Sequence, residues 1–196
     1  MRSHFKPIAV CLLPLAALVA GCGGGTRQDA NEKAGTYKVD VPSAAFPTSQ
    51  HLAQSSELSI AVHNADTRPL PDVAVTVDSF TKDSKQPGLA DPARPVWIVD
   101  AGPLGGDTAY VSTWALGSLA PGATKTFKWK VTPVQSGTYT VRYRVAAGLN
   151  GKAKAELASG GIPAGAFTVK IAQKPSAATV DPKTGAIIRP GEKPEK

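Results

Sequence analysis

Apolar residues alternate with other residues over most of the chain, and this pattern constrains the fold more than any other sequence feature. The clearest run is residues 139–145, where Tyr139, Val141, Tyr143 and Val145 alternate with Thr140, Arg142 and Arg144. Successive side chains of a strand project to opposite faces, so period two predicts a strand with one buried and one solvated face. Eight strand candidates occur: alternating runs at residues 37–41, 58–62, 73–77, 127–131, 139–145 and 167–171, a short continuous apolar run at residues 96–99, and a further candidate at residues 110–114. They predict an all-β antiparallel sandwich of about seven to nine strands.

Two segments depart from the alternation. Residues 82–108 contain four prolines and four glycines, which predicts a long irregular connection. Residues 152–158 are rich in alanine and form either a helical turn or the second half of a hairpin. The hairpin alternative rests on Asn150-Gly151, a dipeptide that favours tight turns between strands.

A short apolar segment at the N-terminus predicts export and membrane attachment. Arg2 and Lys6 precede apolar residues 7–20, which are too few to span a bilayer as a settled helix. The sequence Leu18-Val19-Ala20-Gly21-Cys22 resembles the bacterial lipobox, where the chain is cut and a lipid is placed on the cysteine sulfur. The resemblance implies a signal peptide over residues 1–21 and a lipidated Cys22. It places the mature protein on the extracytoplasmic face of a cell membrane, at the surface or in the periplasm.

The rest of the chain divides into a tether, one domain and a tail. Residues 22–35 start with glycines and lack apolar periodicity, which predicts a flexible tether. Residues 36–172 are sufficient to bury a core and are predicted to form one monomeric domain. Residues 174–196 contain four prolines and eight charged residues, so the tail over residues 173–196 is predicted to be disordered. Cys11 is removed and Cys22 lipidated under this hypothesis, which excludes a disulfide scaffold.

The positive charge of the chain is spread rather than clustered. The net charge is +7, and +5 without Arg2 and Lys6. Lysines and arginines alternate with apolar residues instead of gathering with aromatic ones, which favours a solvated sheet face over nucleic-acid binding. Weak attraction to anionic lipid headgroups or wall polymers stays open.

Sequence motifs for catalysis and metal binding are missing. His51 and His63 are the only histidines of the predicted mature chain, and His63 is interpreted as a turn residue. There is no G-x-S-x-G elbow and no calcium-loop pattern. We therefore predict no metal, no cofactor and no enzymatic activity, with a hydrolase of dispersed site as the least favoured alternative.

Turn motifs carry a resemblance to a known family. Pro121-Gly122 leads into one strand, and Gly137-Thr138-Tyr139 begins the next after a short corner. Residues 58–64 and 70–77 are similar to a first hairpin. These motifs resemble bacterial immunoglobulin-like modules of the CARDB type over residues 58–171. The resemblance implies an immunoglobulin-like β-sandwich in which the Tyr139 hydroxyl binds the backbone of the corner and Gly137 leaves room for it.

The tryptophans are expected to differ in role. Trp129 is in register with Phe127 and Val131, so it is predicted to be a core residue, as is Trp114. Trp97 lies among prolines and glycines, where it either anchors a loop in the core or forms an aromatic recognition surface with Tyr110.

Asp100 and Asp107 flank a glycine-rich loop and either cap turns or meet across it to hold a ligand. The leading function hypothesis is a non-catalytic binding module that contacts an envelope protein or a glycan through residues 82–114. The alternative is a structural or accessory spacer lipoprotein of an envelope assembly that interacts through the tail from Gln173.

Overall fold

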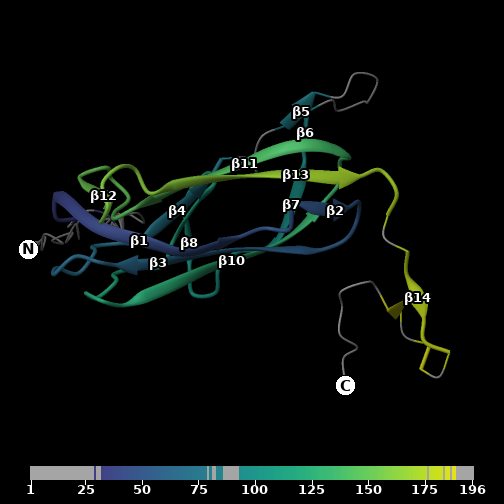
Figure 1. Cartoon of the computed structure of the whole chain (residues 1–196), viewed down its shortest axis with the longest axis horizontal. Coiled ribbons are helices and arrows are strands. Elements are labelled where there is room, and N and C mark those ends of the chain that lie inside the picture. The colour runs from purple at the N-terminus through teal and green to yellow at the C-terminus, as the bar shows by residue number, and fades with distance from the viewer. Residues whose placement is uncertain are drawn as a thin grey trace, which may run out of the picture.

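The computed structural model describes residues 29, 32–78, 80, 83–85, 93–175, 177–182, 184–185 and 187–188 (Figure 1). The predicted signal peptide and Cys22 lie outside these residues, as do residues 86–92 of the irregular connection. The described residues form β-strands, turns and loops, arranged mainly as two sheets packed face to face.

Eleven strands make up the two sheets. The five-stranded sheet has the order β12 (Ala153–Leu157), β1 (Gly35–Ala45), β3 (Ser56–Asn64), β10 (Thr124–Pro133) and β7 (Trp97–Ala101). The six-stranded sheet has the order β2 (Ser49–His51), β13 (Ala164–Ala172), β11 (Gly137–Ala146), β4 (Ala74–Val77), β9 (Thr113–Ala115) and β8 (Asp107–Tyr110). Most neighbouring strands are antiparallel, whereas β12 and β2 pair in parallel with β1 and β13. The predicted all-β, immunoglobulin-like sandwich is confirmed.

The strand count exceeds the predicted seven to nine because short strands show no usable period. β2 has three residues and lay in no predicted run. Residues 110–114 were expected to form one strand, but a turn divides them between β8 and β9. In this turn Ser112 is buried and takes a left-handed conformation with φ of 61°. The connection over residues 82–108 is also more regular than predicted, because it contains the hairpin β5 (Asp83–Lys85) and β6 (Ala93–Pro95) and all of β7.

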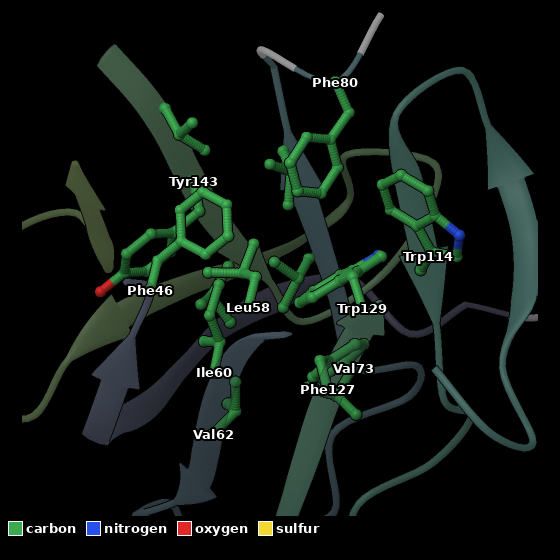
Figure 2. Close-up of a cluster of buried hydrophobic side chains, with 14 of the residues drawn as sticks. Phe46, Leu58, Ile60, Val62, Val73, Phe80, Trp114, Phe127, Trp129 and Tyr143 are labelled. Atoms are coloured by element: carbon green, nitrogen blue, oxygen red, sulfur yellow. The ribbon is translucent and has the colours of Figure 1, made fainter. Parts of the chain in front are cut away.

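The alternating apolar side chains fill the space between the two sheets. Leu58 and Ile60 of β3 and Trp129 of β10 are fully buried, and they face Val141 and Tyr143 of β11. Figure 2 shows Leu58, Ile60, Trp129 and Tyr143 together with Phe46 and Phe80, which come from outside the regular strands. Most of the aromatic rings meet edge to face, for example Trp114 and Trp129 with centroids 5.4 Å apart, whereas Phe127 stacks on Trp129. Most inward positions predicted from the alternation are confirmed, and Val41, Tyr139 and Phe167 are partly buried against the core.

Two predicted hairpins are wrong. Residues 58–64 and 70–77 belong to β3 and β4, which lie in opposite sheets. Asn150-Gly151 likewise connects β11 in one sheet to β12 in the other. Turn residues reverse the direction of the chain but do not specify which sheet receives the next strand. The first connection makes a contact over a long sequence distance: the Asn64 side-chain amide donates to the Leu119 carbonyl at 2.8 Å.

The alanine-rich segment forms strand β12 rather than a helical turn. Its residues pair in parallel with β1 from Gly35↔Ala153 to Val39↔Leu157. The intrinsic preference of alanine for helices is a fraction of a kcal/mol per residue, so pairing with an available sheet edge overrides it.

The predicted tether and the tail leave the sandwich at opposite ends. The loop after Ala146 of β11 lies beside the start of β1, whereas Gly137 at the other end of β11 pairs with Ile171, near the end of β13. Figure 1 shows β1 beginning at one end of the long axis and the tail leaving at the other. The tail was predicted to be disordered, and its described residues contain a short hairpin of β14 (Thr179–Val180) and β15 (Ile187–Ile188).

Candidate functional site

Trp97 is a core residue, which corrects the prediction of an aromatic recognition surface at this position. Its side chain is 1% exposed, and its indole N–H donates to Oε1 of Gln50 at 2.9 Å. The ring packs against Phe46 and Tyr139 with centroid distances of 6.0 and 5.7 Å. The sequence did not settle this role, because the prolines and glycines around Trp97 interrupt the apolar alternation that indicates a strand.

Asp100 and Asp107 belong to different sheets. Asp100 lies on the edge strand β7 of the five-stranded sheet, where its Oδ2 accepts a hydrogen bond from the Thr132 hydroxyl at 2.7 Å. Asp107 begins β8 at the edge of the six-stranded sheet, and its side chain lies outside the described atoms. The meeting of the two carboxylates across the loop therefore stays a prediction.

Of the two aromatic residues proposed for a recognition surface, Trp97 and Tyr110, only Tyr110 is exposed. Its side chain is 49% exposed, and its hydroxyl donates to Oδ2 of Asp29 at 3.4 Å. Ile98, another exposed apolar residue of the same segment, lies on the five-stranded sheet rather than beside Tyr110. The apolar side chains of residues 98–111 thus do not share one face.

Gly137 and Tyr139 form a corner at the start of β11. The Tyr139 hydroxyl donates to the Ser136 carbonyl at 2.9 Å, and burial raises the pKa of this phenol. Gly137 has φ of 142°, and a Cβ added there would lie 3.0 Å from the Tyr139 hydroxyl oxygen. The corner contact expected from the resemblance is present, and it is a structural contact rather than a ligand site.

The outer face of the six-stranded sheet gathers basic side chains. Arg142 and Arg144 project from β11, Lys170 projects from β13, and all three are exposed. The register pairs Arg142 with Ala166, Arg144 with Ala164 and Lys170 with Thr138. We call this surface the basic face and define it by its outward residues: Thr76, Tyr110, Thr113, Thr138, Thr140, Arg142, Arg144, Ala164, Ala166, Thr168 and Lys170.

The strand register also brings Tyr110 onto the basic face. Arg144 pairs with Thr76, Thr76 with Thr113, and Thr113 with Tyr110, so one cross-strand row runs from β11 to β8. The Thr76 and Thr113 hydroxyls are 2.8 Å apart, which fixes their side chains on the same side. Because alanine and threonine occupy the positions between the cations, the basic face has no bulky side chain at its centre.

The two outer faces differ in how their charges are compensated. On the five-stranded sheet, Lys38 pairs with Glu156 at 2.8 Å and Lys128 with Glu57 at 3.1 Å. Across the described part of the chain, no ion pair involves the three cations of the basic face. The strands β4, β11 and β13 contain no Asp or Glu. The strands that carry the three cations of the basic face therefore hold no carboxylate, whereas the strands of the five-stranded sheet carry charges of both signs, including Lys130 and Lys154, for which no ion pair occurs among the described residues.

A further carboxylate, Asp78, follows β4 beside the basic face. Its backbone N–H donates to the Arg142 carbonyl at 3.1 Å, and its side chain is exposed. The position next to Arg142 makes Asp78 the acidic neighbour that a ligand on this face must accommodate.

Asp66 and Arg68 form an ion pair at the tether end of the sandwich. Asp66 accepts hydrogen bonds from Arg68 Nε and from the Lys38 backbone N–H, both at 3.1 Å. These bonds hold the pKa of Asp66 well below its usual range, and the bond from the Arg68 side chain has the larger effect. Arg68 also lies 4.5 Å from the centre of the Tyr37 ring. The cluster ties the connection after β3 to β1.

A cleft of about 300 Å³ lies at the same end, lined by Asp29, Glu32, Lys33, Pro69, Leu70, Pro71, Asp72 and Ser118. Its carboxylates already bind backbone amides: Asp72 accepts from Gly117 N–H at 2.9 Å, and Glu32 accepts from three amides of the loop after β11. Within the described ranges, no three His, Cys, Asp or Glu side chains are placed to hold a metal ion. The cleft is thus a junction of structural contacts.

The two histidines are also apart. His63 lies within β3 and contacts the Thr124 hydroxyl at 3.1 Å, so its interpretation as a turn residue is wrong. The pairing of β3 with β10 runs from Ser56↔Val131 to His63↔Thr124, so His63 is paired within the sheet although Asn64 and Asp66 after it suggested a turn. His51 lies in β2 and contacts the Lys174 carbonyl at 3.2 Å.

The fold and the site define an immunoglobulin-like β-sandwich with one basic sheet face. No protein-family model and no curated protein sequence matches the chain. Among solved structures, the chain is similar to a CARDB domain from Pyrococcus furiosus, crystallised in complex with di-metal ions. The identity is 16%, the coverage 70% of this chain and 93% of that one, and the TM-score 0.42.

It is also similar to native alpha-2-macroglobulin from Escherichia coli, with 15% identity, 76% of this chain covered, 21% of that chain covered and a TM-score of 0.44. CARDB is the family that the turn motifs resemble. Likenesses this distant concern the fold and assign neither an activity nor a ligand. As for membrane crossing, the described residues include no helix of sufficient length and apolar character.

Proposed function

We propose that this protein is a lipid-anchored, extracytoplasmic and non-catalytic binding module that takes an anionic glycan on its basic face. The observation that carries the proposal is the unequal charge of the two sheets. Arg142, Arg144 and Lys170 share one open face without an ion pair among the described residues and lie on strands without a carboxylate, whereas the other sheet mixes lysines with carboxylates and pairs two of them, Lys38 with Glu156 and Lys128 with Glu57.

The chemistry of the basic face suits carboxylate groups on a chain of sugars. A guanidinium presents a planar fork of donors that binds a carboxylate through two hydrogen bonds. Arg142 and Arg144 are two residues apart on β11, so their Cα atoms are separated by about 7 Å along the strand. The threonine hydroxyls between the cations both donate and accept hydrogen bonds, as sugar hydroxyls do. The half-exposed Tyr110 ring supplies an apolar surface at one edge.

The proposal of a non-catalytic module is supported by the contacts of the carboxylates and of His63. The carboxylates of Glu32 and Asp72 are engaged by backbone amides, and His63 contacts a threonine hydroxyl on a sheet surface. In their described contacts Glu32 binds backbone amides and His63 a threonine, and neither contact has the geometry of a base beside a serine nucleophile. The lipobox-like sequence ending at Cys22 supports the anchor.

The glycan proposal is tested with the chain from residue 22 to 196 carrying Cys22→Ser. Binding to polygalacturonate and to neutral dextran is measured for this chain and two triple variants. The first is R142S/R144S/K170S. The second is K38S/K128S/K154S, which removes the same charge from the five-stranded sheet.

The proposal predicts binding to polygalacturonate but not to dextran, and a loss of about tenfold or more only in the first variant, which is about 1.4 kcal/mol. Binding should weaken with salt because exposed charges are screened. Equal losses in both variants would show that net charge, not the basic face, governs binding. Membrane attachment is tested separately by incorporation of a labelled fatty acid, which Cys22→Ser must abolish.

The spacer alternative rests on a different observation. The tail leaves the sandwich near Ile171, and the tether side lies beyond Ala146, so the two are separated by the length of β11, about 30 Å. A domain of this shape would present the tail away from its anchor. Deletion of residues 173–196 discriminates the two functions: glycan binding survives if the basic face carries recognition, and partner capture is lost if the tail does.

A further inference from the structure

Glu32, three residues before β1, is held by the loop that follows β11. One carboxylate oxygen, Oε2, accepts from Leu149 N–H at 2.6 Å and from Asn150 N–H at 2.9 Å. The other oxygen, Oε1, accepts from Ala153 N–H at 2.8 Å. Three backbone amides that converge on one carboxylate form an anion-binding nest. Glu32 is separated from these residues by 117 to 121 positions in the sequence.

The loop is shaped for this carboxylate. A Cβ added at Gly148 would lie 2.2 Å from the Glu32 carboxyl group, so only glycine admits the side chain at this distance. Asn150 closes the loop over the tether, because its side-chain amide donates to the Asp29 carbonyl at 2.9 Å. The backbone N–H of Gly35 donates to the Lys152 carbonyl at 3.0 Å. Asp29, Glu32 and Gly35, all in the second half of the predicted tether, thus contact the same loop.

We propose that the amides of Leu149, Asn150 and Ala153 form a carboxylate-binding site whose ligand is Glu32 of the chain's own tether. Occupancy of this site, which we call the tether lock, shortens the tether and sets which end of the domain faces the membrane. The membrane part of this inference rests on the lipid anchor at Cys22.

The tether lock changes the reach of the domain. With the chain held from Asp29 onward, seven peptide steps separate Cys22 from the sandwich, a span of at most about 25 Å. With residues 22–35 free, thirteen steps would span about 45 Å. The locked domain keeps the loop after β11 near the bilayer, and β11 then runs away from the membrane toward the tail.

The lock itself is tested without a membrane. Amide hydrogen exchange is measured by NMR on the full Cys22→Ser chain and on the same chain with Glu32→Ala. The amides of Leu149, Asn150 and Ala153 should exchange at least about tenfold faster in Glu32→Ala, because they lose their acceptor. The Gly117 amide, which Asp72 binds, should be unchanged. Glu57→Ala, which removes a carboxylate from the sheet surface, is the matched control.

Two further variants sharpen the test. Gly148→Ala should accelerate the same three amides by displacing Glu32 from the loop. Acetate added to Glu32→Ala should slow their exchange by filling the emptied site, and chloride at equal ionic strength should not. Unchanged exchange in Glu32→Ala, or equal acceleration in Glu57→Ala, would overturn the tether lock.

The membrane part is tested with the lipidated chain in vesicles that carry an acceptor dye on their headgroups. A donor dye is placed on Lys152→Cys, at the tether end, or on Val134→Cys, between β10 and β11 at the opposite end. Transfer should be stronger from position 152 than from position 134, and Glu32→Ala should reduce the difference. Equal transfer from both positions would overturn the orientation. Failure of the lipid anchor is recognised separately, because the chain would then not remain on the vesicles.

Discussion

The replacement Trp97→Ala should bring the domain close to unfolding. Trp97 is 1% exposed and is among the largest buried side chains, and removing a buried tryptophan costs about 3–5 kcal/mol. The change also leaves Oε1 of Gln50, a residue 2% exposed, without its donor, which adds about 1–3 kcal/mol. The sum is about 4–8 kcal/mol, comparable with the whole stability of a domain of this size, about 5–15 kcal/mol.

Trp97→Phe separates the hydrogen bond from the packing. Phenylalanine keeps a ring against Phe46 and Tyr139 but cannot donate to Gln50, so a buried acceptor stays unsatisfied. Trp129→Phe is the matched control, because Trp129 is also fully buried but its indole N–H has no hydrogen-bond partner in the described part of the structure.

Urea unfolding followed by far-UV circular dichroism measures both effects. Trp97→Phe should be less stable than Trp129→Phe by about 1–3 kcal/mol, the cost of the orphaned acceptor. The assignment of Trp97 to the core would be refuted if Trp97→Ala lost less than about 1 kcal/mol, a value typical of surface positions.

Three other outcomes follow from the contacts described above. Tyr139→Phe removes the hydroxyl that donates to Ser136 and should cost about 1 kcal/mol in urea unfolding, without altering glycan binding. Gly137→Ala should cost about as much or more, because its φ of 142° disfavours a side chain and the added Cβ would meet the Tyr139 ring. Asp66 has a lowered folded-state pKa, so its stabilising contribution is present above its ordinary pKa of 3.8 and is lost as pH falls through the folded-state value. Urea midpoints measured from about pH 5 downward should therefore fall more steeply for the native chain than for Asp66→Asn, and parallel curves would contradict the Arg68 contact.

The local alternation predicted most inward positions because it depends only on the geometry of a strand. Leu58, Phe127 and Val141 are buried as expected, since the pleat places every second side chain on one face. The sheet that each strand joins was not predictable in the same way. Asn150-Gly151 has the composition of a hairpin turn, but the next strand pairs with β1, more than one hundred residues earlier in the chain.

In the candidate site, too, the direction of a side chain was predictable from the local sequence, whereas its neighbours on other strands were not. The outward positions of Arg142 and Arg144 follow from the run at residues 139–145. Their association with Lys170 and Tyr110 depends on cross-strand register, which no local pattern encodes. Glu32 gave no signal at all, because its partners are backbone amides of a distant loop.

The most direct test of the account is to locate the bound glycan by NMR. The amide resonances of the Cys22→Ser chain are followed during titration with polygalacturonate at low salt. The account predicts that shifts concentrate on β11, β13 and β4, around Arg142, Arg144 and Lys170, and that R142S/R144S/K170S abolishes them. Shifts confined to residues 98–104 or to the tail would contradict the assignment of recognition to the basic face.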